Sequence, residues 1–242
     1  MKDVLVIGES CRDIFIYCDA NRLCPDVPVP VLNIVNQTEN GGMAKNVHRN
    51  ILTRIESCDI LTNTDWINVT KTRYVHNASN HMFFRVDSPN NIGKINLNEV
   101  DYDYKLIVIS DYDKGFLSES DIQTICENHD NVFIDSKKIL GDWASKAKFI
   151  KINDYEYKRS EKFISDELKS KIIHTMGGDG CKYQNKVYKV NKVDVKDTSG
   201  AGDSFLAGLV IEYLKSNDIE KSINFANKCA SEVVKHRGVT VI

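Results

Sequence analysis

Short runs of apolar residues, separated by longer polar stretches, form the basic pattern of this chain. A strand covered on both faces of a parallel sheet is apolar throughout rather than alternating, and such runs lie at Val4–Ile7, Leu106–Ile109, Val132–Ile134, Phe149–Ile152 and Ile172–Thr175. Polar or amphipathic stretches of helical length lie between or after them, at Asn46–Arg54, Ser118–Asn128, Ser160–Ser170, Ser204–Lys215 and Lys221–His236. This alternation predicts an α/β fold in which helices cover both faces of a doubly wound, mostly parallel sheet.

A different pattern occupies two segments, at about residues 13–35 and 71–87. They consist of alternating, proline-rich or strand-like stretches, namely Asp13–Tyr17, Pro25–Val35, Arg73–His76 and His81–Val86. Because these segments contain few helix formers, we expect them to build a small antiparallel β-sheet that stands off the main sheet as a lid. Edge strands of the main sheet are the alternative.

Composition and charge exclude several classes of protein. The 242 residues include 32 basic and 34 acidic side chains, so no overall positive field attracts nucleic acid or an anionic membrane. The apolar runs are strand-sized, and we expect neither a membrane-spanning helix nor a signal peptide. The 7 cysteines lack C-x-x-C spacing, which favours reduced thiols in a cytoplasmic protein. Residues 1–242 are expected to form a single domain.

The segment Asp197–Asp203 reads D-T-S-G-A-G-D and leads directly into an amphipathic helix. Gly200 and Gly202 let the backbone approach a ligand closely, and N–H groups at a helix start attract anions. Asp203 is either a general base beside this anion site or a carboxylate that complements the helix dipole. An anion site next to a base suits phosphoryl transfer to a hydroxyl. A Walker A motif and a G-x-G-x-x-G turn after the first strand are absent from the sequence, so it supports neither a P-loop NTPase nor a Rossmann dehydrogenase.

This segment closely resembles the D-T-x-G-A-G-D signature of the ribokinase-like (PfkB) carbohydrate kinases, and other motifs of that family occur in the same order. Gly41–Asn46 resembles the G-G-x-G-x-N sugar-binding motif, with Ala44 in place of a glycine. Asn153–Glu156 resembles N-x-x-E, and Thr175–Gly180 resembles the T-x-G-x-x-G nucleotide loop. The motifs span nearly the whole chain, so the resemblance implies the ribokinase-like fold.

Within the family the chain is most similar to the D-glycero-β-D-manno-heptose-7-phosphate kinases. The stretches that carry this similarity are Arg22–Val31, Lys71–Arg73, Arg85–Asp87, Ser110–Gly115, Asp135–Lys137 and Phe225–Asn227. Relative to the family, a helix and a strand are missing between Ile51 and Lys71, and the stretch between Glu156 and Ile172 is short. We therefore expect a shortened kinase domain, without the nucleotidyltransferase domain of the bifunctional relatives.

The resemblance implies roles on the acceptor side of the site. Asp203 would accept a proton from the attacking hydroxyl, while the N–H groups of Gly200, Ala201 and Gly202 stabilise the transferring phosphoryl group. The residues implied to bind the sugar or its phosphate are Asp13, Gly41, Gly42, Asn46, Arg73, Lys114 and Lys137. The alternatives are a helix cap for Asn46 and solvated side chains for the two lysines, and for Arg85 we prefer a surface ion pair.

A second group of residues is implied to bind ATP: Asn153, Glu156, Thr175, Gly177, Gly180 and Asn227. Asn153 and Glu156 would also hold Mg²⁺ through water molecules, since this ion gives up its waters reluctantly. The alternative for this pair is a capping box, in which each side chain accepts the backbone N–H of the other residue. A requirement for a monovalent cation stays open.

The expected activity is ATP-dependent phosphorylation of a hydroxyl group on a sugar or sugar phosphate. Heptose 7-phosphate, converted to heptose 1,7-bisphosphate, is the leading candidate substrate. The alternatives are a PfkB-type kinase for another sugar or a nucleoside, and a non-catalytic descendant that only binds sugar or nucleotide. Lid strands would leave open edges and apolar faces in a monomer, which predicts a homodimer that pairs two lids.

Overall fold

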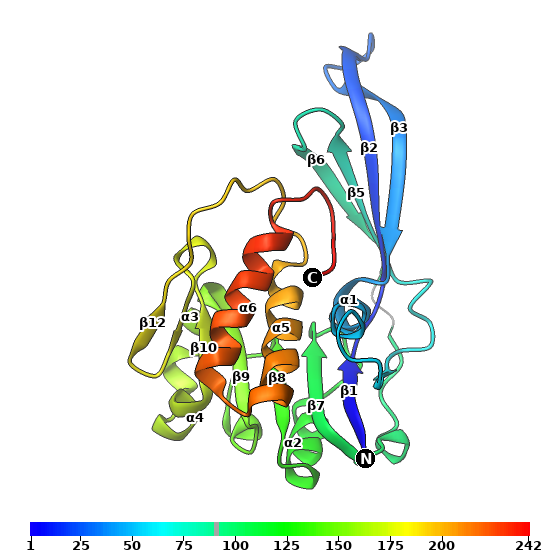
Figure 1. The fold of residues 1–242 in the computed structure, drawn as a ribbon. Helices are drawn as coiled ribbons and strands as arrows, with labels where there is room; N and C mark the ends of the chain where they lie inside the picture. The colour runs from blue at the N-terminus through cyan, green and yellow to red at the C-terminus, as the bar shows by residue number, and fades with distance from the viewer. Residues whose placement is uncertain (90–91) are drawn as a thin grey trace.

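The computed structural model describes residues 1–89 and 92–242, and its centre is an eight-stranded sheet (Figure 1). In spatial order the strands are β12 (Lys186–Tyr188), β11 (Cys181–Tyr183), β10 (Ile172–Thr175), β9 (Phe149–Asn153), β8 (Val132–Ser136), β7 (Tyr104–Asp111), β1 (Lys2–Gly8) and β4 (Cys58–Leu61). The strands from β10 to β4 run parallel, and β11 and β12 form an antiparallel hairpin at one edge. Every apolar run that we expected in the parallel sheet lies in one of its strands.

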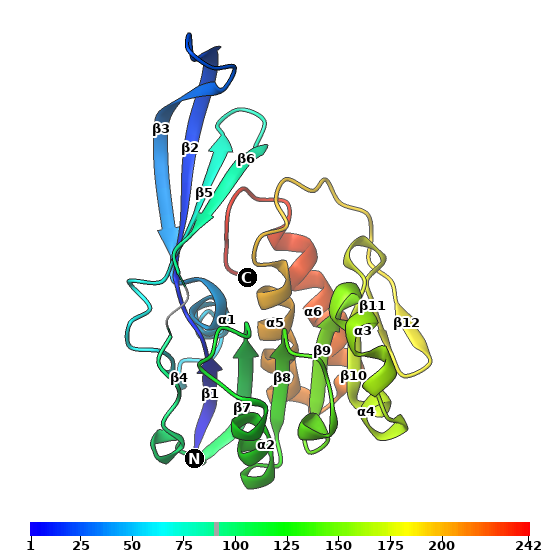
Figure 2. The same ribbon diagram turned by 180° about the vertical axis from the view of Figure 1, so that it is seen from behind.

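Helices cover both faces of this sheet, which confirms the predicted layering (Figures 1 and 2). On one face lie α1 (Gly42–Leu52), α5 (Ala201–Ser216) and α6 (Ile219–Val233), and on the other α2 (Glu119–Asn128), α3 (Asp154–Ser160) and α4 (Asp166–Lys171). A hydrophobic core lies on each face of the sheet, and alternate side chains of one strand pack into different cores. Val4 and Val6 of β1 belong to the core with α1, α5 and α6, whereas Leu5 and Ile7 belong to the core with α2 and α4.

A second sheet stands off the main one and forms the blade at the top of Figure 1; we call it the lid. Its strands, in spatial order, are β3 (Pro30–Asn40), β2 (Arg12–Leu23), β5 (Thr70–His76) and β6 (Met82–Asp87). The two outer pairs are antiparallel, as expected, but the central pair of β2 and β5 is parallel. The reason is topological: β2 follows β1 and β5 follows β4, and these two parallel neighbours send the chain out of the main sheet in the same direction.

The prediction of a single helix over Ser160–Ser170 is wrong. This stretch holds the end of α3, a 3₁₀ turn at Glu161–Phe163, and α4. Ile164 has extended backbone angles, and the Ser165 side chain accepts a hydrogen bond from the Leu168 N–H. A serine in this position caps a new helix, so the chain begins one here.

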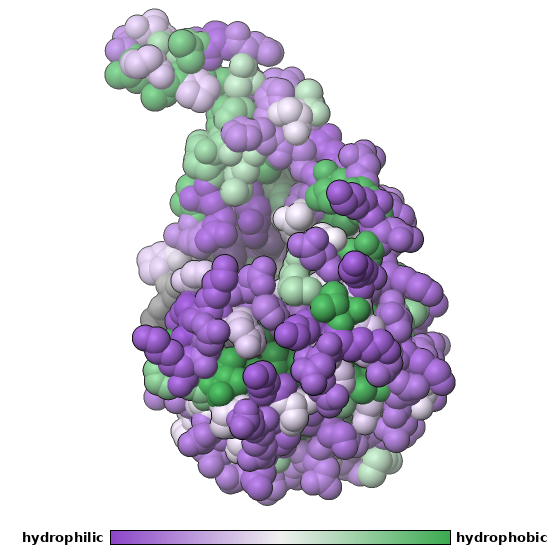
Figure 3. Space-filling view, turned by 90° about the vertical axis from the view of Figure 1, so that its left-hand side faces the viewer, coloured by the Kyte–Doolittle hydropathy of each residue, from purple (hydrophilic) through white to green (hydrophobic). Residues whose placement is uncertain are grey.

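The lid overhangs the carboxyl ends of the parallel strands, and Figure 3 shows the surface hollowed between lid and body. Large apolar side chains are exposed on the outer strands of the lid, namely Ile34, Val35, Met82, Phe84 and Val86. In the ranges that the structure describes, no helix combines the length and hydrophobicity needed to cross a membrane.

Candidate active site

The loop before α5 turns sharply at Gly200. This residue has φ 79°, in the left-handed region that glycine tolerates best, and its carbonyl accepts the first helical hydrogen bond from the Ser204 N–H. Among the described residues, the N–H groups of Gly200 and Gly202 have no acceptor. The Ala201 N–H donates to the Thr198 carbonyl instead. The turn therefore offers the amides of the two glycines to an anion, but the contribution expected from Ala201 is already used within the loop.

Asp203 lies in the first turn of α5 with 7% of its surface exposed. Its Oδ2 accepts a hydrogen bond from Asn46 Nδ2 on α1 at 2.7 Å, and its Oδ1 accepts one from the Tyr112 hydroxyl at 2.7 Å. Burial raises the pKa of the Asp203 carboxyl, and the two hydrogen bonds oppose this rise. A carboxylate that is more basic than an exposed one is suited to accept a proton near neutral pH.

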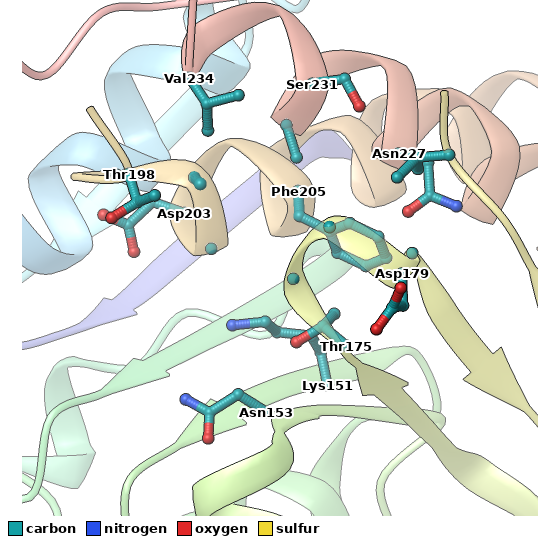
Figure 4. A pocket seen from close by; sticks show the side chains of 18 of the residues that line it. Lys151, Asn153, Thr175, Asp179, Thr198, Asp203, Phe205, Asn227, Ser231 and Val234 are labelled. Atoms are coloured by element: carbon teal, nitrogen blue, oxygen red, sulfur yellow. The ribbon is translucent and has the colours of Figure 1, made fainter. Parts of the chain in front are cut away.

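A cavity of about 870 Å³ opens over the ends of β8, β9 and β10 and is closed by α5 and α6 (Figure 4). This size is typical of small-molecule sites. Of the expected nucleotide-binding residues, those that line it are Asn153, Thr175, Gly177, Gly180 and Asn227. Figure 4 shows Thr198 and Asp203 at one end of the cavity and Asn227 at the other. An elongated ligand would thus have its anionic end beside the glycine turn.

The loop between β10 and β11 has two glycines with positive φ. Gly177 and Gly180 have φ of 57° and 88°, and a Cβ on Gly180 would lie 2.0 Å from the Tyr188 carbonyl oxygen. The Asn227 amide donates to that same carbonyl at 3.1 Å. The Thr175 hydroxyl donates to the Ile152 carbonyl at 3.2 Å. Both polar side chains therefore have backbone partners and shape the cavity wall.

A smaller cavity of about 170 Å³ lies beneath the lid, and the expected sugar-binding residues that line it are Asp13, Gly42, Asn46 and Arg73. Gly41 does not line it; this residue precedes α1, and its carbonyl accepts the Cys11 N–H. Gly42 has φ 50°, and a Cβ there would lie 2.7 Å from Cys11 Sγ. Tyr112, Gly200 and Asp203 line both cavities, so the Asp203 carboxylate lies where the two meet.

The positive charge of the smaller cavity comes from two residues of β5. Arg73 is paired with Asp13, with Nε 3.0 Å from Oδ1 and Nη2 3.4 Å from Oδ2, so its charge is largely offset. Lys71 has its ammonium 2.9 Å from Met43 Sδ and 5.2 Å from the centre of the Tyr112 ring. Within the part of the chain that the structure describes, Lys71 forms no salt bridge. Lys71 is therefore the less compensated cation of this cavity.

Charged side chains at the ends of β8 and β9 form a buried cluster that includes Lys151, a residue the sequence pattern did not single out. Lys151 is 4% exposed and pairs with Asp135 at 2.6 Å, and a Cβ on Gly202 would lie 3.1 Å from its Nζ. Lys137 pairs with Glu156 at 2.5 Å and with Asp135 at 3.5 Å. Both lysines line the larger cavity. The sequence did contain a signal for this cluster: Lys151 lies inside the apolar run of β9, and a buried lysine needs partners of opposite charge.

Asn153 and Glu156 form a capping box at the start of α3. Asn153 Oδ1 accepts the Glu156 N–H at 2.9 Å, and Glu156 Oε2 accepts the Asn153 N–H at 2.8 Å. The capping alternative is thus realised, although Asn153 also lines the larger cavity. Glu156 is 3% exposed and lies outside the lining of that cavity. Among residues 1–89 and 92–242, no group of three or more His, Cys, Asp or Glu side chains could hold a metal ion.

Two further basic residues lie away from the cavities. The Lys114 side chain lines neither of them, and the Lys114 N–H donates to Glu9 Oε1 at 2.9 Å. The structure thus does not bring Lys114 to the expected site. Arg85 pairs with Asp87 at 2.8 Å, which confirms the expected surface ion pair.

Comparison of the sequence with known proteins gives a family match and distant relatives. Residues 61–242 match the model of a family described as pfkB family carbohydrate kinase. The bifunctional protein HldE of Helicobacter pylori (strain G27) is 26% identical over 298 residues, an alignment that covers 98% of this chain and 64% of that protein. The chain therefore spans less than two thirds of the length of this curated relative.

Solved structures with the same fold include two ribokinases. The ribokinase of Thermotoga maritima has a TM-score of 0.75 at 15% identity, with 99% of this chain and 95% of that chain covered. The ribokinase of Arabidopsis thaliana, complexed with ribose and ATP, has a TM-score of 0.67 at 12% identity, with 98% and 94% covered. At these identities the likeness establishes a ribokinase-like fold.

Proposed function

The chain belongs to the pfkB family of carbohydrate kinases, and from this membership we propose that it transfers the γ-phosphoryl group of ATP to a hydroxyl of a sugar phosphate. The leading candidate acceptor is heptose 7-phosphate, supported by stretches such as Arg22–Val31 and Ser110–Gly115 that resemble the heptose-7-phosphate kinases. The position of Asp203 carries the proposal: a buried carboxylate lies where two cavities meet, beside a turn of free amides.

In the proposed reaction the acceptor lies in the smaller cavity and ATP in the larger one. Asp203 accepts the hydroxyl proton as the oxygen forms a bond to the γ-phosphorus. The bond from that phosphorus to the bridging oxygen breaks, and ADP leaves with the electron pair. The N–H groups of Gly200 and Gly202 bind oxygens of the transferring group. A positioned base contributes about 10²–10⁴-fold, and loss of an anion-hole donor costs roughly 10²–10³-fold.

Lys137 and Lys151 supply positive charge beside this transfer path. Burial lowers the pKa of Lys137, but the charges of Asp135 and Glu156 outweigh burial and hold it above its ordinary value. Mg²⁺ that arrives with ATP would neutralise phosphate charge. Asn153, which lines the larger cavity, would contact its waters, whereas the Glu156 carboxylate is engaged by Lys137 and the helix cap.

The charge of the smaller cavity supports a phosphorylated acceptor. The sequence resemblance implied Arg73 as a phosphate contact, but the carboxylate of Asp13 already offsets its positive charge. We therefore assign the Asp13–Arg73 pair to sugar hydroxyls. Lys71 provides the positive charge that the phosphate group of the acceptor requires. An ammonium pointed at a phosphate gives a charge-assisted hydrogen bond, about twice as strong as a neutral one.

The test is ADP release by the purified chain with ATP and a panel of sugars, sugar phosphates and nucleosides. We expect turnover with heptose 7-phosphate and at most weak turnover with unphosphorylated sugars. Activity only on unphosphorylated sugars or nucleosides would favour the alternative kinase. Calorimetry that shows ATP binding, with no phosphoryl transfer to any compound, would favour a non-catalytic descendant.

We further propose that two copies pair through their lids. The outer strands β3 and β6 each have one edge without a partner in the lid sheet, and they expose Ile34, Val35, Phe84 and Val86. Pairing would cover these edges and side chains. A cytoplasmic location stays a prediction that rests on the unpaired cysteines.

A further inference from the structure

Tyr112 follows β7 and lines both cavities, and its hydroxyl donates a hydrogen bond to Asp203 Oδ1 at 2.7 Å. The motifs of the sequence give this residue no role. We propose that Tyr112 is a positioning residue of the kinase site, which holds the Asp203 carboxylate at the junction of the two cavities and turns it toward the acceptor hydroxyl. This inference rests on the proposed function, because it assigns Tyr112 a part in that same reaction.

The backbone of Tyr112 is fixed by a fully buried carboxylate. Glu9 follows β1 and has none of its surface exposed. Its Oε2 accepts the Tyr112 N–H at 2.7 Å, and its Oε1 accepts the Lys114 N–H at 2.9 Å. Hydrogen bonds to a charged acceptor are shorter and stronger than neutral ones. Glu9, just after the end of β1, therefore holds the loop after β7 by two hydrogen bonds to a buried carboxylate.

The side chain of Tyr112 is fixed as well. The ammonium groups of Lys71 and Lys137 lie 5.2 Å and 5.4 Å from the centre of its ring. One lysine comes from the lid and the other from the loop after β8, so the phenol ring contacts cations from both cavities. Attraction between a cation and a ring of this kind is worth about 0.5–2 kcal/mol. The hydroxyl is thus presented to Asp203 in one orientation.

The phenol acts as a donor and not as a base. Burial raises the pKa of Tyr112 well above its ordinary value, and the negative charges of Asp203 and Asp135 raise it further. Tyr112 therefore stays protonated throughout the neutral range and always offers its proton to Asp203. Because Asn46 occupies Oδ2 in the same way, both carboxylate oxygens have a fixed partner and the carboxylate cannot rotate freely.

The hydrogen bond from Tyr112 also affects how easily Asp203 is protonated. Burial raises the pKa of Asp203, while the bonds from Asn46 and Tyr112 stabilise the ionised form. The charged groups that surround Asp203 are Asp135 of β8, Lys137 after β8, Lys151 of β9, and Asp13, Lys71 and Arg73 on the lid side. None of these is altered by removal of the Tyr112 hydroxyl. Removal of the hydroxyl therefore raises the pKa of Asp203. As the pH falls, the carboxylate then becomes protonated, and stops acting as a base, at a higher pH than in the wild type.

The experiment is Tyr112→Phe, which keeps the ring and its two lysine contacts. We expect kcat to fall roughly ten- to a hundredfold, the effect of losing a hydrogen bond to a charged group. The acidic limb of the profile of kcat/KM against pH should move to higher pH, because loss of the hydrogen bond from Tyr112 raises the pKa of Asp203, while KM for ATP stays near the wild-type value. Tyr102→Phe is the matched control, because Tyr102 packs in the core with α2, away from both cavities. It should leave all three quantities unchanged.

Carboxyl titration by NMR separates this inference from the proposed function. In protein with ¹³C-labelled aspartate and no substrate, the Asp203 signal is identified by its absence in Asp203→Asn. A higher titration midpoint in Tyr112→Phe supports the positioning role even where no acceptor is phosphorylated. An active enzyme in which Tyr112→Phe leaves kcat, the acidic limb and this midpoint unchanged overturns it.

Glu9→Gln provides a second variant that leaves the phenol intact. It removes the charge that holds the loop, so kcat and the acidic limb should change in the same directions as in Tyr112→Phe, by smaller amounts. If the unfolding curve shows that Tyr112→Phe does not fold, the dependence of kcat/KM on pH in Glu9→Gln tests the positioning role instead. An unshifted acidic limb there contradicts the role assigned to the loop.

Discussion

At the residue scale, the properties of Asp203 come from distant parts of the chain. Asn46 lies on α1 and Tyr112 follows β7, yet both donate to this one carboxylate at the start of α5. Lys151 on β9 adds a nearby positive charge that lowers the pKa, against the burial that raises it. The result is a carboxylate that is more basic than an exposed one and is held in a single orientation, which is what proton transfer from an alcohol requires.

Asp203→Asn tests the proposed base directly. The amide cannot accept a proton, so we expect kcat to fall at least about 10²-fold, with little change in the affinity for ATP. The measurements are steady-state turnover and calorimetric ATP binding. Asp218→Asn is the control, because Asp218 caps α6 outside both cavities and asparagine caps helices equally well. Near-normal turnover in Asp203→Asn would exclude the base role.

Lys71→Met tests the proposed contact with the substrate phosphate. Loss of a charge-assisted hydrogen bond should lower kcat/KM for a sugar phosphate about ten- to a hundredfold, while any activity on the matching unphosphorylated sugar changes little. Lys146→Met is the control, because Lys146 is exposed in the loop before β9, outside both cavities. An equal loss on both acceptors would show that Lys71 does not bind the phosphate.

At the element scale, the start of α5 depends on its glycine turn and on the contacts that hold it. Asp197 accepts the N–H groups of Ser199 and Gly238, which ties the loop to the segment after α6. Gly200 then turns the chain with positive φ, and the N–H groups of Gly200 and Gly202, which have no acceptor among the described residues, lie at the wall of the larger cavity. The positive end of the helix dipole points the same way, which favours a phosphate at this position.

Gly200→Ala tests this geometry. A Cβ at position 200 would lie 3.0 Å from Asn46 Nδ2 and 3.2 Å from Val239 Cγ1, and left-handed backbone costs an alanine about 1–2 kcal/mol. We expect a lower unfolding temperature, and a lower kcat because Asn46 is pushed from Asp203. Gly178→Ala is the matched control: it lines the same cavity, and a Cβ there has nothing within 4 Å. Equal behaviour of the two variants would contradict the role of the turn.

At the scale of the whole molecule, one sheet, the lid, would carry both part of the proposed acceptor site and the proposed dimer contact. Strand β5 contributes Lys71 and Arg73 to the smaller cavity, and its neighbour β6 exposes apolar side chains at the outer edge of the same sheet. Contacts between two lids would therefore act on a sheet that also forms part of the acceptor site. This arrangement predicts that loss of the dimer weakens acceptor binding more than ATP binding.

Phe84→Glu tests the proposed dimer. Phe84 is 48% exposed on β6 and stacks on Tyr74 with ring centres 4.7 Å apart, so a charge there would disrupt an apolar interface. Light scattering at micromolar concentration should report a dimer for the wild type and a monomer for the variant. Phe163→Glu is the control, because Phe163 is 57% exposed in the turn between α3 and α4. A monomeric wild type would overturn the proposal.

The sequence alone determined the features whose signals are short-range. Apolar runs specify the buried strands β1, β7, β8, β9 and β10, because a strand covered on both faces needs apolar residues at every position. The turn at Gly200 and the loop at Gly177–Gly180 are visible because only glycine adopts their backbone angles readily. The capping box of Asn153 and Glu156 can also be recognised from the sequence, because its two residues are only three positions apart.

Only the tertiary structure decided which of these residues meet. Tyr112 and Lys151 reach the surroundings of Asp203 because the carboxyl ends of parallel strands share one edge of the sheet, and no local pattern encodes that meeting. The pairing of Asp13 with Arg73 follows from β2 and β5 lying side by side and parallel, which depends on where β1 and β4 leave the main sheet. Contacts between residues far apart in sequence arise from topology, whereas residue type only determines what they do once they touch.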